Sequence, residues 1–152
     1  MIKLNDIQSF TDWAESQLPF INAVNDYLKD YENEIDENRI SQLSTEKILA
    51  MQEILYGYFG SLVEPYSKSE MYRRTAIARE TRKCHESGMP PSVAKTVAEE
   101  RCGNEIMINE ILHRLNSTID KLLIVLSVRL SYEKSLFFGS GRAGTTGKTT
   151  PF

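Results

Sequence analysis

The chain has 152 residues, with a hydrophobic content of 41% and a charged content of 26%, as expected for one soluble globular domain. No apolar run approaches the ~20 residues that a membrane span needs. The first residues also lack the basic-then-apolar order of a signal peptide. These features argue against a membrane protein, and we expect a cytoplasmic one.

Charge is distributed unevenly along the chain. Residues 1–66 contain four Lys/Arg and twelve Asp/Glu, a net charge of −8, whereas residues 67–152 contain fourteen and nine, a net charge of +5. Such asymmetry suggests that one half faces an acidic partner or the other half of a neighbouring subunit.

Two helices are predicted in the acidic part. Residues 5–18 carry an apolar face, with Asn5 or Asp6 as the cap, and Pro19 is expected to end this helix. A second helix is predicted from Pro19 to about Asn38, with a solvated acidic face.

Two further helices are predicted before the middle of the chain. One begins near Ser44 or Thr45 and stops at Pro65, and the next covers residues 67–86. Gly88, with Pro90 and Pro91 after it, is expected to end the second of these helices with a rigid turn.

A long helix is predicted from Ser92, its expected cap, to about Phe138, continuous or kinked at Gly103. The alternative is a break at Gly103, with Asn104 as the cap of a new helix. Its apolar stripe is expected to be too long for one subunit to bury, which predicts coiled-coil-like self-association. The residues predicted for this seam are Ile108, Ile111, Leu115, Ile119, Leu122, Leu126 and Leu130.

The predicted fold is therefore all-α, an elongated helical hairpin or bundle with a long C-terminal helix. Residues 1–138 form a single domain, with acidic helices in 1–65 and a basic helical hairpin in 66–138. Residues 139–152, rich in Gly and Thr, are predicted to be a flexible tail. Cys84 and Cys102 are interpreted as free thiols.

The most informative cluster of charged residues is a basic one on the helix predicted at 67–86. Arginine predominates there, and its guanidinium suits bidentate phosphate contact. Arg101 and Arg114 would extend the cluster if the two helices pack as a hairpin; the alternative is a solvated face or ion pairs with an acidic neighbour. The candidate nucleic-acid-binding residues are Arg73, Arg74, Arg79, Arg82 and Lys83.

Motifs for catalysis are absent or incomplete. Gly147-Lys148-Thr149 lacks the earlier glycine of a P-loop and the helix that must follow it. Ser92 and Lys95 match S-x-x-K, but the other motifs of serine acylating enzymes are missing. His85 and His113 have no spacing that gathers metal ligands. We therefore expect a protein that is not an enzyme and that has no cofactor or metal.

The basic half combines an Arg-rich helix from Tyr72 to Lys83, a break at Ser87-Gly88, and a helix ending in residues 119–134. This layout resembles the small helical recombination mediators of T-even-type phages, over less than half of the chain. The resemblance implies an oligomer that binds single strands and helps to load a recombinase, in the host cytoplasm if a phage encodes it. The acidic helices and the tail have no counterpart in that family.

The expected function is therefore a non-catalytic accessory role in DNA metabolism, in which a homo-oligomer binds single-stranded nucleic acid. The alternative is a protein–protein module, either a phage structural component or a small regulator or inhibitor docking on an enzyme. Pro151 and Phe152 resemble the partner-docking tip of bacterial single-stranded-DNA-binding proteins, although Arg142 and Lys148 replace its acids.

Overall fold

The computed structural model describes residues 9–32 and 42–146, with side chains described as far as residue 136. In these ranges the chain forms four helices and no strand: α1 (Phe10–Glu32), α3 (Thr45–Glu86), α4 (Pro91–Arg101) and α5 (Gly103–Thr146). The prediction of an all-α fold with a long C-terminal helix is confirmed. None of the helices in the described ranges combines the length and the apolar character that a membrane crossing requires.

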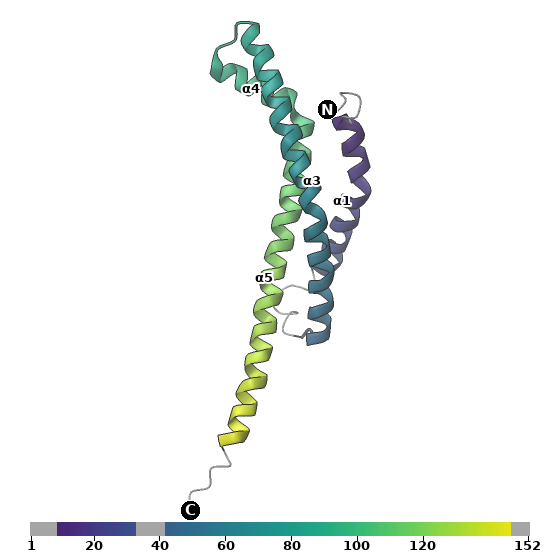
Figure 1. Cartoon of the computed structure of the whole chain (residues 1–152), viewed down its shortest axis with the longest axis vertical. Coiled ribbons are helices and arrows are strands. Elements are labelled where there is room, and N and C mark those ends of the chain that lie inside the picture. The colour runs from purple at the N-terminus through teal and green to yellow at the C-terminus, as the bar shows by residue number, and fades with distance from the viewer. Residues whose placement is uncertain (1–8, 33–41, 147–152) are drawn as a thin grey trace, which may run out of the picture.

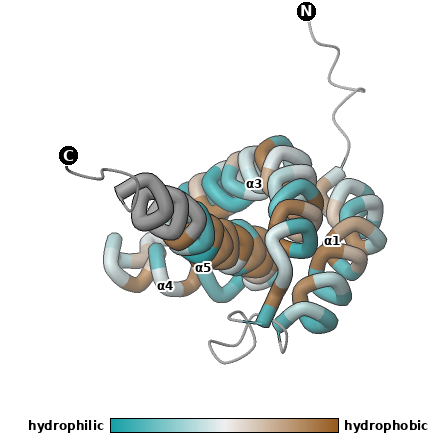
Figure 2. Tube along the Cα trace, turned by 90° about the horizontal axis from the view of Figure 1, so that it is seen from below, coloured by the Kyte–Doolittle hydropathy of each residue, from teal (hydrophilic) through white to brown (hydrophobic). Residues whose placement is uncertain are grey.

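The architecture is an elongated antiparallel hairpin of α3 and α5 (Figure 1). The short helix α4 closes the end of the hairpin where α3 finishes, and α1 lies beside its middle part. Seen end-on, the apolar residues of the three longer helices face one another (Figure 2). The hairpin predicted for the basic half is therefore present, but α3 is about twice as long as the helix expected there.

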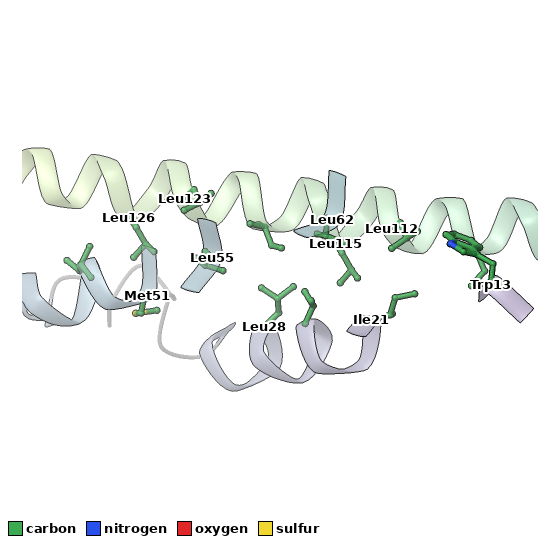
Figure 3. Close-up of a cluster of buried hydrophobic side chains, with 14 residues drawn as sticks. Trp13, Ile21, Leu28, Met51, Leu55, Leu62, Leu112, Leu115, Leu123 and Leu126 are labelled. Carbon is green, nitrogen blue, oxygen red and sulfur yellow. The ribbon is translucent and has the colours of Figure 1, made fainter. Parts of the chain in front are cut away.

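One continuous core holds α1, α3 and α5 together (Figure 3). Trp13 is 2% exposed, and Val24, Leu55 and Leu112 are fully buried. A buried Leu or Ile side chain contributes about 1.5–3 kcal/mol relative to an exposed one. The core therefore explains why these helices stay paired along a narrow molecule.

Both prolines expected to stop helices lie inside them, which corrects two predicted boundaries. Pro19 lies within α1 and Pro65 within α3. A proline inside a helix costs about 3 kcal/mol, but apolar residues on both sides of each proline pack into the core and offset that cost. Ser9 caps α1 by accepting a hydrogen bond from the Asp12 amide at 3.2 Å, whereas Asn5 and Asp6 lie outside the described residues.

The end of α3 matches the prediction. Gly88 has φ +88°, and the Met89 amide donates to the Cys84 carbonyl while the Gly88 amide donates to that of His85. This is the Schellman pattern, in which a left-handed glycine ends a helix. The predicted cap of the next helix was wrong, because α4 begins at Pro91 and Ser92 lies inside it; proline at the first helical position presets φ.

The long C-terminal segment is divided between α4 and α5 at Cys102, which has φ −100° and ψ 26°. Hydrogen bonds still connect the two helices, since the Cys102 amide donates to Ala98 and the Ile106 amide donates to Cys102. The segment is therefore not one continuous helix: α4 and α5 meet at Cys102, and α5 begins at Gly103 rather than after a cap at Asn104.

The seam predicted for self-association is covered within the chain, which corrects the premise of that prediction. Ile108, Leu115, Ile119 and Leu126 are buried in the core. Ile111, Leu122 and Leu130 are partly buried against the same core. The reason is that α1 and the first half of α3 together supply enough apolar surface for one subunit to bury this stripe.

The helix α5 continues through Thr146 and so includes the first eight residues of the predicted tail; the predicted flexibility of this tail stays a prediction. Extending an existing helix avoids the unfavourable nucleation step, so Gly and Thr are tolerated there. Pro151 and Phe152 lie outside the described residues.

The two cysteines are free, as predicted, and both are buried. They lie at the closed end of the hairpin with Ala76, Ala94 and Ala98, all buried small residues. Burial raises the pKa of the Cys102 thiol, and the carboxylates of Glu105 and Glu80 raise it further. The thiol therefore stays protonated at neutral pH and is a poor nucleophile.

Candidate nucleic-acid interface

The five basic residues predicted to bind nucleic acid do not form one surface. At about 100° per residue, Arg73 and Arg82 point to opposite sides of α3. All five are exposed. Arg79 and Lys83 belong to a cluster at the closed end of the hairpin, Arg73 lines a groove nearer its middle, and Arg74 and Arg82 belong to neither.

The cluster at the closed end is centred on Glu80, whose side chain is only 16% exposed. Its carboxylate lies 3.2 Å from Lys83 Nζ, 3.5 Å from Arg101 Nη1 and 4.0 Å from Arg79 Nε. The hydrogen bond from Lys83 is the main cause that lowers the pKa of Glu80 below its usual value. These ion pairs join α3 to the end of α4, so part of the basic charge here has a structural role.

The groove lies between α3 and α5 and has a volume of about 570 Å³. We call it the basic groove. Both helices of the hairpin contribute to it, and α1 does not. It is lined by Tyr66, Glu70, Arg73, Asn109, Glu110, His113, Arg114, Ser117, Thr118 and Lys121.

A buried polar network forms one wall of the basic groove. The Asn109 amide nitrogen donates to Ser69 Oγ at 2.9 Å, and Ser69 Oγ donates to the Tyr66 carbonyl at 2.7 Å. Arg73 Nη1 donates to Asn109 Oδ1 at 3.3 Å. Since Asn109 is 5% and Ser69 1% exposed, water cannot replace these bonds cheaply. The network therefore holds Arg73 at the groove.

Two rings lie beside this wall. The Tyr66 hydroxyl and His113 Nδ1 are 3.0 Å apart, and their ring centroids are 5.9 Å apart with an interplanar angle of 31°. Burial, and then the nearby carboxylate of Glu70, raise the pKa of Tyr66, so the phenol keeps its proton. The pair presents an aromatic surface from two different helices.

The charges of the basic groove favour an anion. Arg73, Arg114 and Lys121 supply three cations, against the carboxylates of Glu70 and Glu110. Glu70 is also paired with Arg74 at 3.9 Å, and Arg74 does not line the groove. The charge of Glu70 is therefore partly balanced from outside.

Only Arg73 among the five predicted residues lines the basic groove, and Arg114 joins it as the hairpin arrangement implied. The sequence patterns did not single out Tyr66, Asn109 or Lys121, and they assigned His113 no role. Tyr66 and His113 are 47 positions apart, so only the register of α3 against α5 brings them together. No local pattern carries that signal.

A second groove follows along the same side of the hairpin. We call it the apolar groove; its volume is about 440 Å³. Exposed fractions are 57% for Tyr56, 56% for Ile124 and 64% for Val128, so large apolar side chains face solvent here. It is lined by Tyr56, Phe59, Asp120, Leu123, Ile124, Ser127, Val128 and Ser131.

In the part of the chain that the structure describes, no three His, Cys, Asp or Glu residues gather into a metal-binding arrangement. No protein-family model matches the chain, and neither curated proteins nor solved structures yield a match. The residues of the two grooves are therefore the basis for a functional proposal.

Proposed function

We propose that this protein is a non-catalytic accessory protein of DNA metabolism that binds single-stranded nucleic acid. The observation that supports it best is the basic groove, where three cations from two helices lie beside two aromatic rings. A basic groove that follows the backbone, combined with aromatic side chains, is the usual design of proteins that bind single strands.

Affinity in such a protein comes mainly from neutralising phosphates and releasing their counterions. The exposed cations Arg74, Arg82 and Lys95 lie outside the groove and add a weaker long-range attraction. Little base preference is expected, because phosphate contacts and stacking on rings do not distinguish one base from another. A recombination mediator has these properties, and the resemblance of the basic half to that class supports the same role.

The test is fluorescence anisotropy with a labelled single-stranded oligonucleotide across a salt series. The logarithm of the affinity is expected to fall linearly with the logarithm of the salt concentration. Replacing Arg73, Arg74, Arg79, Arg82 and Lys83 with alanine should weaken binding and flatten this dependence. The control is Lys29→Ala on the acidic helix α1, which should leave the affinity and its salt dependence unchanged. Absence of binding at low salt contradicts the proposal.

The apolar groove supports a second candidate function, a protein–protein module that assembles by self-association. The occupant we propose for it is a second copy of this chain, as oligomeric mediators require. Charge complementarity favours this occupant, because the adjoining basic groove faces solvent while α1 exposes acids. The exposed acids of α1 are Asp12, Glu15, Asp26, Asp30 and Glu32.

A further inference from the structure

We propose that the basic groove is a site for about five nucleotides of an unpaired strand, in which one base stacks on the Tyr66–His113 pair. The adjoining phosphates contact Arg73, Arg114 and Lys121. This inference rests on the proposed function and narrows it to one of the two basic surfaces.

The ring pair is the first reason. The Tyr66 hydroxyl and His113 Nδ1 are joined by a hydrogen bond of 3.0 Å, so each ring helps to set the position of the other. An aromatic surface whose position is already set loses little entropy when a base stacks on it. Base–aromatic stacking is available only to an unpaired base, because the faces of paired bases are covered within a duplex.

The placement of the cations is the second reason. Arg73 is held by the buried Asn109, whereas Arg114 and Lys121 are seven positions apart on α5, about two helical turns. Cations therefore lie along the groove rather than at one point. Such a row suits a chain of phosphates better than a single small anion.

The length of the groove sets the size of the site. Its lining on α5 extends from Asn109 to Lys121, about 18 Å at 1.5 Å per residue. A stacked strand rises about 3.4 Å per nucleotide, so the groove accommodates about five nucleotides. Beyond Lys121 the lining becomes apolar at Ile124 and Val128, which offers no partner for further phosphates.

The cluster at the closed end lacks these features. Arg79, Lys83 and Arg101 share the carboxylate of Glu80, and the described rings that contact one another all lie nearer the middle of the hairpin. This cluster can attract a polyanion, but in the described residues it holds no pair of contacting rings on which a base could stack. Substitutions in the basic groove and substitutions in the closed-end cluster are therefore expected to affect oligonucleotide binding differently.

The experiment compares two double variants, each of which removes two exposed cations. Arg114→Ala with Lys121→Ala changes the basic groove, and Arg82→Ala with Lys95→Ala changes the closed end. Anisotropy is measured with labelled oligothymidylates of three to twelve nucleotides. The groove variant is expected to lower the salt slope by about 1.4, because each phosphate that a protein neutralises on a single strand contributes about 0.7. The closed-end variant should lower it much less.

Base stacking has its own readout. Tyr66→Leu keeps apolar bulk but removes the ring, and it should weaken oligothymidylate binding about fivefold or more. Binding of an abasic strand with the same number of phosphates should be unchanged by this variant. Tyr66→Phe keeps the ring and is the matched control. Circular dichroism identifies a variant that fails to fold. If Tyr66→Leu does so, the variant with Arg114→Ala and Lys121→Ala still tests the groove, because both of these side chains are exposed.

The outcomes separate the inference from the proposed function. Affinity should rise with length up to about five nucleotides and then level off, and a duplex should bind less well than a single strand. If the chain binds strands but only the closed-end variant weakens binding, the groove assignment is wrong and the proposed function stands. If the unaltered chain binds no strand at low salt, the proposed function fails and the inference fails with it.

Discussion

At the scale of single residues, Asn109 shows how one polar side chain organises the hairpin. It lies between Ile108 and Ile111 on the face of α5 that meets α3, where an apolar residue would be expected. Its two hydrogen bonds reach Ser69 and Arg73, both on α3. An Asn buried among apolar residues costs little only when its partners are aligned, so it favours one register of α5 against α3.

Glu80 makes stability depend on pH. The bonds from Lys83 and Arg101 lower the pKa of this carboxyl in the folded chain, so folding favours its ionised form. The resulting stability is fully present above the ordinary pKa of a glutamate, about 4.3, and is lost as the pH falls through the lower pKa of the folded state. We expect Glu80→Gln to lower the thermal midpoint at pH 7 and to reduce its loss on acidification.

The measurement is the difference in thermal midpoint between pH 7 and pH 3 for each protein. Glu86→Gln is the matched control, since Glu86 is exposed and pairs with no cation in the described residues. It should leave both the midpoint and its pH dependence close to those of the unaltered chain. An unaltered pH dependence in Glu80→Gln would show that other carboxyls cause the acid sensitivity.

At the scale of helices, the prolines mark the limit of local rules. Pro19 and Pro65 each carry the signal of a helix end, yet α1 and α3 pass through both. The signals that the fold does follow are local to the backbone, namely Ser44 as the cap of α3 and Gly88 as its stop. A cap or a left-handed turn acts within a few residues, whereas tolerance of an internal proline depends on the apolar partners across the core.

Gly103 and Gly88 allow a matched test of how the local backbone conformation at a glycine affects stability. A Cβ at Gly103 would meet no atom within 4 Å, and its φ is not positive, so Gly103→Ala is expected to stabilise by about 0.5–1 kcal/mol. Gly88 is equally open but has φ +88°, where a side chain costs about 1–2 kcal/mol. Gly88→Ala should therefore destabilise. Denaturant unfolding by circular dichroism measures both, and equal effects of the same sign would contradict the assignment.

At the scale of the whole molecule, the fold class and the pairing of the last two long helices could be predicted from apolar periodicity. The site could not be predicted to the same depth. Arg73 and Arg114 could be anticipated from charge, but the basic groove also needs Tyr66 and His113 to meet across two helices. That meeting depends on the register that Asn109 and Ser69 favour, and a single sequence does not encode register in a local pattern.

Burial of the predicted seam changes where self-association is expected. The stripe from Ile108 to Leu130 is covered by α1 and α3, so an interface between copies has to use the uncovered side of the hairpin. Ile124 and Val128 lie there, and further along α5 Tyr132 is 55% and Leu136 52% exposed. In Figure 1, α5 also extends beyond the start of α3, so no described helix lies beside this end.

We expect the mass in solution, measured by light scattering after size exclusion, to be at least twice the 17.4 kDa of one chain. Val128→Glu places a charge in the apolar groove, and burying an unpaired charge between copies is strongly unfavourable, so this variant should shift the mass towards one chain. The control is Val93→Glu, at a residue of α4 that is 47% exposed and outside both grooves; it should leave the mass unchanged. A single-chain mass for the unaltered protein across concentrations would exclude a second copy as the occupant, and strand binding would then depend on one basic groove per molecule.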